Sequence, residues 1–270
     1  IHQGGDVPFD VSNVKCVFST KRAKSAICSD GKVFSWGLTD EGGVAPADLS
    51  GVIDIKSNEK AFVGLYHNGN IVCWGDSATG GTIPPDVSNV IQLYSNKNAF
   101  SVLQSNGSIK SWESITGSIP DLKNVIDIYS TNSSFAALDS SGNVYCWGSV
   151  DSTQNTPPTD LSNVAIVYSN DDAFAALISD GTVMCWGDAG NGGTTPVDIS
   201  NVDYISNTNT AFTAVTNDGK IISWGNTSNG GTFINDTYDE DSPVQTILVT
   251  ADLSGVFKFT GFDDCSGNLE

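Results

Sequence analysis

The chain reads Ala-Phe-Ala-Ala-Leu-Ile-Ser-Asp-Gly-Thr-Val-Met-Cys-Trp-Gly over residues 173–187. Small and apolar residues alternate on both sides of the Asp-Gly pair, which is typical of two pleated strands joined by a hairpin turn. The preceding residues 163–169, Asn-Val-Ala-Ile-Val-Tyr-Ser, predict another strand before a polar turn. Because no window of useful length has a helical period, we expect a unit of three antiparallel strands.

This unit recurs along the chain, and each copy carries one tryptophan five residues after a turn glycine. The tryptophans are Trp36, Trp74, Trp112, Trp147, Trp186 and Trp224, spaced 38, 38, 35, 39 and 38 residues apart. Such a period indicates one repeated supersecondary unit. We interpret the tryptophans as structural residues that pack between units, each with a backbone partner for its indole N–H. The alternative is a column of aromatic rings that binds sugars or proline-rich peptides.

An odd number of strands leaves the chain at the end of the unit opposite to where the next unit begins. The linkers, such as residues 76–85 with their Gly-Gly and Pro-Pro pairs, are long enough to return in an extended form. Their prolines suit an edge position that lacks a hydrogen-bond donor. This is the connection between neighbouring blades of a β-propeller, so we expect an all-β fold.

The repeated pattern Val-x-x-Ile-x-Ser, then Ala-Phe-Ala-Ala-Leu-x-x-Asp-Gly-x-Val-x-x-Trp-Gly, resembles the repeats of the regulator-of-chromosome-condensation superfamily. The short period is most similar to its compact members, such as the bacterial propeller-type β-lactamase inhibitor. The resemblance covers residues 10–235 well and residues 236–261 poorly. It implies a seven-bladed β-propeller with mostly three-stranded blades of about 38 residues, in which the seventh blade is degenerate.

We expect residues 1–270 to form a single repeat domain. Its six full units are expected to start at Asp10, Asp48, Asp86, Asp121, Asp160 and Asp198. A closing unit is expected from residues 236–270 together with residues 1–9, which would complete the ring near the chain ends. Residue 1 shows neither an initiator methionine nor a signal sequence. The competing expectation is therefore an excerpt from a longer array of units.

The chain is strongly acidic, with a net charge of −19. Residues 1–123 carry ten basic and twelve acidic residues, whereas residues 124–270 carry two and nineteen. This composition argues against nucleic acid as a partner. The acidic half serves solubility in the simplest interpretation, and attracts cations or basic partners in the alternative one.

Several features predict a secreted, extracellular or cell-surface glycoprotein. Four Asn-x-Ser/Thr sequons provide candidate glycosylation sites at Asn106, Asn132, Asn226 and Asn235. The chain also has six cysteines and many Ser, Thr, Asn and Gly residues. No run of 18 apolar residues is present, so the sequence predicts no membrane span.

The cysteines fall into two groups. Cys73, Cys146 and Cys185 precede a tryptophan, and we expect them to be packing residues, because equivalent positions on different blades lie too far apart for a disulfide. Cys16 and Cys28 lie on either side of a turn centred near Lys21 and Arg22, which predicts that they face one another. They could form a disulfide or remain thiols. Cys265 has no obvious partner in the sequence.

No pattern of catalytic or metal-binding residues emerges. His2 and His67 are 65 residues apart and belong to no ligand or nucleophile motif. Asp236, Asp239 and Asp241 offer oxygen ligands for calcium, although their spacing is not that of a helix–loop–helix site; the alternative is a solvated charge run. We therefore expect no enzyme and no cofactor, with calcium as the exception to test.

Binding is expected on the turns between the first and second strands, because these turns vary while the blades stay constant. Their charged members, which we take as candidate binding residues, are Lys21, Arg22, Lys60, Lys97, Asp171 and Asp172. The leading hypothesis is a non-catalytic extracellular module for protein interaction or structure, in which basic turns of one copy could meet the acidic half of another in a larger assembly or filament. A lectin-like glycan binder and an inhibitor of a secreted enzyme are the alternatives.

Overall fold

The computed structural model describes residues 12–113, 119, 121–148 and 153–232. These residues form six three-stranded antiparallel sheets, each built from three consecutive strands. The first strands are β1 (Val14–Ser19), β4 (Val52–Ser57), β7 (Val90–Ser95), β10 (Val125–Ser130), β13 (Val164–Ser169) and β16 (Val202–Asn207). The second strands are β2 (Ala23–Cys28), β5 (Ala61–Tyr66), β8 (Phe100–Gln104), β11 (Ser134–Asp139), β14 (Ala173–Ile178) and β17 (Ala211–Thr216). The third strands are β3 (Val33–Gly37), β6 (Ile71–Gly75), β9 (Ile109–Trp112), β12 (Val144–Gly148), β15 (Val183–Gly187) and β18 (Ile221–Gly225).

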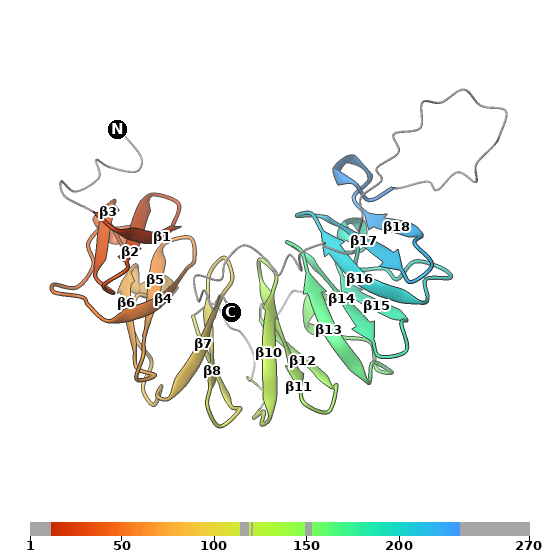
Figure 1. Ribbon diagram of the computed structural model, residues 1–270, viewed down its shortest axis with the longest axis horizontal. Coiled ribbons are helices and arrows are strands. Elements are labelled where there is room, and N and C mark those ends of the chain that lie inside the picture. The colour runs from red at the N-terminus through yellow and green to blue at the C-terminus, as the bar shows by residue number, and fades with distance from the viewer. Residues whose placement is uncertain (1–11, 114–118, 120, 149–152, 233–270) are drawn as a thin grey trace.

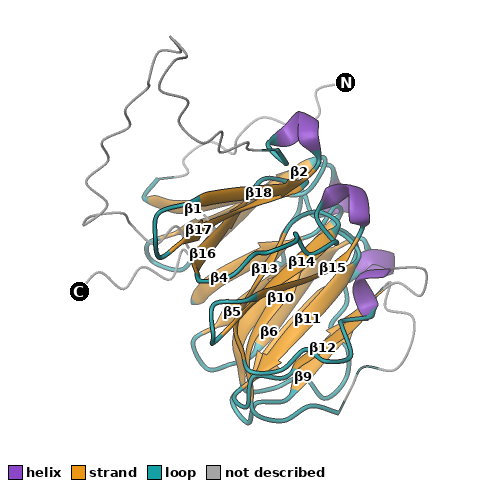
Figure 2. Ribbon diagram, turned by 90° about the vertical axis from the view of Figure 1, so that its right-hand side faces the viewer, coloured by secondary structure: helices purple, strands orange, loops and turns teal. Residues whose placement is uncertain are grey.

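The sheets follow one another in chain order along an arc, from β1–β3 at one end to β16–β18 at the other (Figure 1). First strands of neighbouring sheets contact each other, so the first strand of each blade is the inner one. Short 3-10 helices follow most third strands and lie along one side of the molecule (Figure 2). They are η1 (Thr39–Glu41), η2 (Ser77–Thr79), η3 (Thr153–Asn155), η4 (Ala189–Asn191) and η5 (Thr227–Asn229). This arrangement is that of β-propeller blades.

Each first strand begins with a left-handed residue and a β-bulge. The residue before the opening valine has a positive φ in every blade, at Asn13, Gly51, Asn89, Asn124, Asn163 and Asn201. Asparagine and glycine tolerate this conformation better than other residues. Directly after the valine, the pairing with the second strand shifts by one residue. An extra residue on one strand is the hallmark of a bulge.

The bulge overturns the predicted pairing of Cys16 with Cys28. Because the register shifts between Val14 and Cys16, Cys16 faces Ile27 and Cys28 faces Val14. Cys28 is a buried free thiol. Cys16 is disulfide-bonded, but its partner is none of the cysteines among the described residues, since the other four are free.

A repeated aromatic contact joins one blade to the next. In blades two to six a phenylalanine of the second strand packs against the tryptophan of the third strand, with ring centroids 5.1 to 5.6 Å apart. In the second, third and sixth blades, the linker of the preceding blade packs against the phenylalanine through a glycine, namely Gly42, Gly80 or Gly192. A Cβ atom added to Gly192 would lie only 2.7 Å from the Phe212 ring, and Gly192 has a φ of 105°. Only glycine therefore fits beneath the ring.

Backbone hydrogen bonds complete the contact between blades. The Trp224 Nε1 atom donates to the Gly192 carbonyl at 3.1 Å, and Trp112 donates to the Gly80 carbonyl at 3.3 Å. A second hydrogen bond joins the start of β16 to the β14–β15 turn of the preceding blade, where Val202 N donates to the Gly181 carbonyl at 2.9 Å. The same valine-to-glycine bond joins every other pair of successive blades in the described chain. Each blade is therefore positioned by its neighbour, and the tryptophans pack within these contacts. The expected backbone partner is not present in every unit, since Trp147 Nε1 donates to the Ser111 hydroxyl and the buried Trp74 Nε1 has no hydrogen-bond partner among the described residues.

Cys73, Cys146 and Cys185 are free thiols placed just before the tryptophans. Cys185 is buried and the other two are partly buried. Burial raises the pKa of each of the three thiols to about 12. None of them pairs with a cysteine of another blade, as expected for side chains that fill space.

Replacing Gly192 with alanine is expected to lower the free energy of unfolding by about 2 to 4 kcal/mol, because the new methyl group collides with Phe212 and the backbone stays left-handed. Urea unfolding followed by tryptophan fluorescence measures this change. The matched control is Gly190→Ala in η4, where the nearest atom would be Asp188 Oδ1 at 3.2 Å; its effect should stay within about 0.5 kcal/mol. Equal effects of the two substitutions would contradict the proposed packing.

The three thiols before the tryptophans should resist alkylation in the folded protein. At pH 8 a thiol with a pKa of about 12 is ionised in only about one molecule in ten thousand, and the thiolate is the reactive form. Iodoacetamide labelling followed by mass spectrometry should find Cys73, Cys146 and Cys185 unmodified at pH 8 and modified after unfolding in guanidinium. Rapid labelling of the native protein at pH 8 would refute the burial of these side chains.

Candidate functional site

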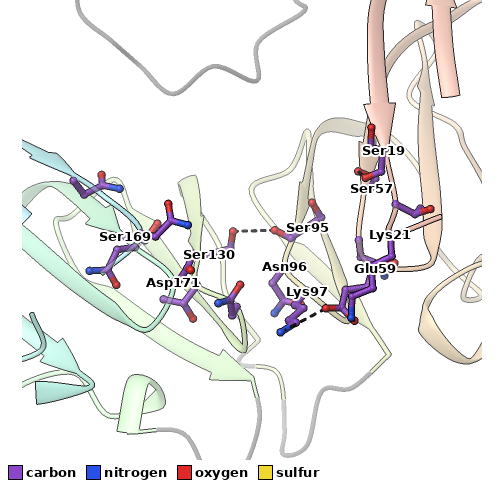
Figure 3. Close-up of a pocket in the computed structure, with 17 residues that line it drawn as sticks. Ser19, Lys21, Ser57, Glu59, Ser95, Asn96, Lys97, Ser130, Ser169 and Asp171 are labelled. Carbon is purple, nitrogen blue, oxygen red and sulfur yellow. Dashed lines mark hydrogen bonds and ion pairs between the residues drawn. The ribbon is translucent and has the colours of Figure 1, made fainter. Parts of the chain in front are cut away.

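The turns between first and second strands of all six described blades meet around one depression of about 570 Å³. We call it the axial depression, because the inner strands lead to it. Figure 3 shows side chains from successive blades, among them Ser19, Lys21, Glu59, Lys97 and Asp171, arranged around this opening. All of the described lining residues are polar or charged, chiefly Ser, Thr and Asn with Lys, Glu and Asp. The surface is therefore built for hydrogen bonds and ion pairs.

A relay of backbone hydrogen bonds fixes these turns to one another. Lys21 N donates to the Glu59 carbonyl at 2.9 Å, and Glu59 N donates to the Lys97 carbonyl at 3.1 Å. The relay continues from Lys97 to Asn132, from Asn132 to Asp171 and from Asp171 to Asn209. One such bond crosses each boundary between described blades. The backbone position of each turn therefore depends on the neighbouring blades as well as on its own hairpin.

In the five blades with a described short helix, the residue before the relay residue ties the turn to that helix. Asn170 accepts from Ala173 N through Oδ1 at 2.8 Å and donates through Nδ2 to the Asn191 carbonyl at 2.7 Å. Asn58 makes the same pair of contacts, accepting from Ala61 N and donating to the Thr79 carbonyl. Asparagine is common in such turns because its side chain can bond to the nearby backbone. These residues support the site and do not offer their polar groups to a ligand.

The serines that end the inner strands connect neighbouring blades. Ser57 Oγ donates to the Ser19 carbonyl and Ser130 Oγ donates to the Ser95 carbonyl, both at 2.9 Å. Both hydroxyl groups lie on the wall of the axial depression. They reinforce the relay from a position two residues before the relay residue of the same blade.

A charged triad occupies the part of the axial depression formed by the first three blades. Glu59 lies between two lysines, with Lys21 Nζ 2.7 Å from Oε2 and Lys97 Nζ 3.5 Å from Oε1. The hydrogen bond from Lys21 is the main cause that lowers the pKa of Glu59. Lys21 and Lys97 stay 60% and 48% exposed, so their ammonium groups remain accessible to a partner.

The fifth blade brings acidic groups to the opposite part of the site. Asp171 lines the axial depression, and Asp172 follows it. Desolvation raises the pKa of Asp172, and the nearby charges of Asp171 and Asp188 raise it further. Asn191 Nδ2 donates to Asp172 at 3.1 Å, which partly offsets the repulsion. The site is thus basic on one side and acidic on the other.

The structure separates the six candidate binding residues into two sets. Lys21, Lys97 and Asp171 line the axial depression. The other three, Arg22, Lys60 and Asp172, each follow an axial residue in the turn and pair instead with the linker after the third strand of their own blade. Arg22, for example, pairs with the buried Glu41. Similarly, Lys60 Nζ lies 3.7 Å from Asp76 Oδ2, and Asp172 accepts a hydrogen bond from Asn191 Nδ2.

Sequence reasoning did not select Glu59 or the inner-strand serines. Glu59 occupies the same position of the repeat as Lys21 and Lys97, which is the signal that could have identified it. The alignment of the turns alone could not show which of two adjacent charged residues faces the axis, because that depends on the backbone conformation of the turn.

Other predicted sites lie elsewhere. Asn106 and His67 are in exposed turns between second and third strands, Asn132 lines the axial depression, and Asn226 caps η5 by accepting from Ser228 N. The calcium candidates Asp236, Asp239 and Asp241, as well as His2, Asn235 and Cys265, lie outside the described residues. Within the described ranges, no group of three or more His, Cys, Asp or Glu side chains could hold a metal ion. No described helix has the length and apolar character to cross a membrane.

No family model matches the sequence, and no curated protein matches it. The structure of Prp20p from Saccharomyces cerevisiae, the yeast RCC1, is similar at 16% identity and a TM-score of 0.51, over 77% of this chain and 71% of Prp20p. Human WBSCR16 is similar at 15% identity and a TM-score of 0.52, over 80% of this chain and 78% of WBSCR16. These similarities concern the fold, and the resemblance to the compact bacterial inhibitor stays a prediction. The chain folds as an RCC1-like repeat β-propeller.

Proposed function

We propose that this chain is a non-catalytic extracellular module that binds a protein, or a second copy of itself, through the axial depression. One observation carries the proposal. The backbone groups of the surrounding turns are used in the relay between blades, whereas Lys21, Lys97 and Asp171 project charged side chains from it. Binding surfaces are often built in this way, with variable side chains on loops that a rigid scaffold positions.

The charges of the site suit a protein partner. The triad offers exposed ammonium groups on the side of the first three blades, and Asp171 offers a carboxylate on the other side. A second copy of the chain could place its acidic side against these ammonium groups. Such complementarity mainly increases the association rate and selects the partner. Prp20p was described together with its binding to Gsp1p and histones, which supports a role for this fold in binding proteins.

We propose further that the ring has seven units, closed by residues 236–270 together with residues 1–9. The extracellular setting rests on the sequons and the cysteines of the sequence. Sugars attached at Asn106 would lie in a turn between second and third strands, away from the axial depression, whereas the sequon at Asn132 lies on its wall.

A lectin and an enzyme inhibitor are the alternative functions. Sugar-binding sites often use aromatic rings, but none of the described residues that line the axial depression is aromatic. Tyr94, on an inner strand, donates its hydroxyl to Asp127 of the next blade at 2.8 Å. Desolvation, followed by the charge of Asp127, raises the pKa of Tyr94. These observations favour the protein-binding proposal over the lectin.

Replacing both Lys21 and Lys97 with alanine should reduce self-association at least tenfold, because the substitution removes the exposed cations of the site. Sedimentation velocity at about 50 and about 500 mM salt compares this variant with the wild-type chain. High salt should weaken the wild-type association as well, because salt screens interactions between exposed charges.

The control carries Lys32→Ala and Lys220→Ala. Both lysines are exposed and pair with an aspartate two residues earlier, in turns between second and third strands. This variant should associate like the wild type. A wild-type chain that remains monomeric at every salt concentration and binds glycans in a Lys21-dependent way would replace the proposal with the lectin alternative.

A further inference from the structure

Glu59 differs from the other charged residues on the basic side of the axial depression. The turns of the first three blades place Lys21, Glu59 and Lys97 at one equivalent position of the repeat. The backbone relay links the three residues in that order, so one carboxylate lies between two ammonium groups (Figure 3). Glu59 therefore cancels one of the two positive charges that the lysines bring to the site.

The carboxylate of Glu59 is divided between the two lysines. Its Oε2 atom lies 2.7 Å from Lys21 Nζ, and its Oε1 atom lies 3.5 Å from Lys97 Nζ. The Glu59 side chain is only 18% exposed, far less than either lysine. A partner that approaches from solvent therefore meets two accessible ammonium groups that already share an internal carboxylate.

The fold itself does not depend on this carboxylate. The relay between the first three blades uses the backbone of Glu59, whose N–H donates to the Lys97 carbonyl and whose carbonyl accepts from Lys21 N. Among the described residues, the two lysines are the only partners of the carboxylate. Its charge consequently acts on the lysines and not on the frame that positions them.

The energies of exposed ion pairs indicate what such a carboxylate does to binding. Ion pairs with solvent-exposed lysines contribute little net stability, so the carboxylate of a partner is able to displace Glu59. An isolated carboxylate gains little by doing so, because it exchanges one ion pair for another. A segment with several neighbouring carboxylates gains more, since it engages both ammonium groups at once while Glu59 turns to solvent.

We infer that Glu59 is a built-in competitor for the acidic segment of a protein partner, and that it makes the axial depression select clustered carboxylates over isolated ones. The internal group that now contacts both ammonium groups is itself a carboxylate, so the carboxylates of a partner fit the same positions. This inference rests on the proposed function for the place of binding. It adds the chemistry of the partner and the residue that determines the specificity.

The variant Glu59→Gln tests this role, because glutamine keeps the shape and one oxygen acceptor but removes the charge. Hexaglutamate serves as the probe, and calorimetry measures its binding at about 50 mM salt, where charges are weakly screened. The variant should bind hexaglutamate about tenfold more tightly than the wild type, since a repulsion between neighbouring carboxylates is removed. Hexaglutamine should bind to neither chain. Equal or weaker binding of hexaglutamate by the variant would overturn the inference.

Two further variants separate competition from a general effect of charge. Asp30→Asn changes the net charge by the same amount in an exposed turn, where Asp30 pairs with Lys32 at 3.1 Å, and it should bind hexaglutamate like the wild type. Adding Lys21→Ala and Lys97→Ala to Glu59→Gln should abolish the gain. A gain that Asp30→Asn reproduces, or that survives the loss of both lysines, would refute the competition.

NMR of the wild-type chain tests the displacement without any variant. Near neutral pH, hexaglutamate should shift the Glu59 carboxyl signal together with the ammonium signals of Lys21 and Lys97, and should leave that of Lys32 unchanged. Shifts of the ammonium signals without a shift at Glu59 would show that the peptide adds to the triad without displacing the carboxylate, contrary to the inference.

The outcomes also separate this inference from the proposed function. Lysine-dependent self-association in the sedimentation experiment, combined with equal hexaglutamate binding by the wild type and Glu59→Gln, would refute the competition and leave the proposed function standing. A monomeric chain that gains affinity for hexaglutamate through Glu59→Gln would support the competition and count against self-association.

Discussion

The contact between the linker of one blade and the phenylalanine–tryptophan pair of the next is the constraint on which the rest of this structure depends. A three-stranded sheet of about 38 residues cannot bury both of its faces alone, so each blade completes its core against a neighbour. The glycine allows a left-handed linker to pass directly beneath the aromatic ring, as Gly192 does beneath Phe212. The tryptophan N–H then bonds to the glycine carbonyl, which joins packing and hydrogen bonding in one place.

The axial depression follows from these contacts. Once the blades are fixed to one another, their inner strands end side by side, and the turns can exchange one backbone hydrogen bond across every boundary. The side chains of the turns are not needed for that relay, so they are free to differ. Lys21, Lys97 and Asp171 give the opening a basic and an acidic side, and the frame of turns beneath these side chains is fixed by the relay. The first and last described blades lack the same contacts with described residues on one face each.

Much of the fold could be predicted from the sequence, because the units are local. Strand alternation, the turn glycines and the recurring tryptophan lie within a few residues of one another, and all six described units fold as three-stranded sheets. The error at Cys16 and Cys28 has a local cause as well. A left-handed Asn13 and a bulge after Val14 shift the register by one residue, and counting from the turn centre assumes a regular ladder. The Asn-Val or Gly-Val pair at the start of each unit was the signal for that bulge.

The sequence by itself determined the repeat, the three-stranded unit and the turns that carry variable charge, since these depend on neighbours along the chain. Only the tertiary structure decided which charged residue of each turn reaches the axis. Lys21 and Arg22 are adjacent, yet Lys21 joins the triad with Glu59 and Arg22 turns back to the buried Glu41. The difference arises from the neighbouring blades, because the relay of hydrogen bonds between them sets the orientation of each turn, and no single unit contains that information.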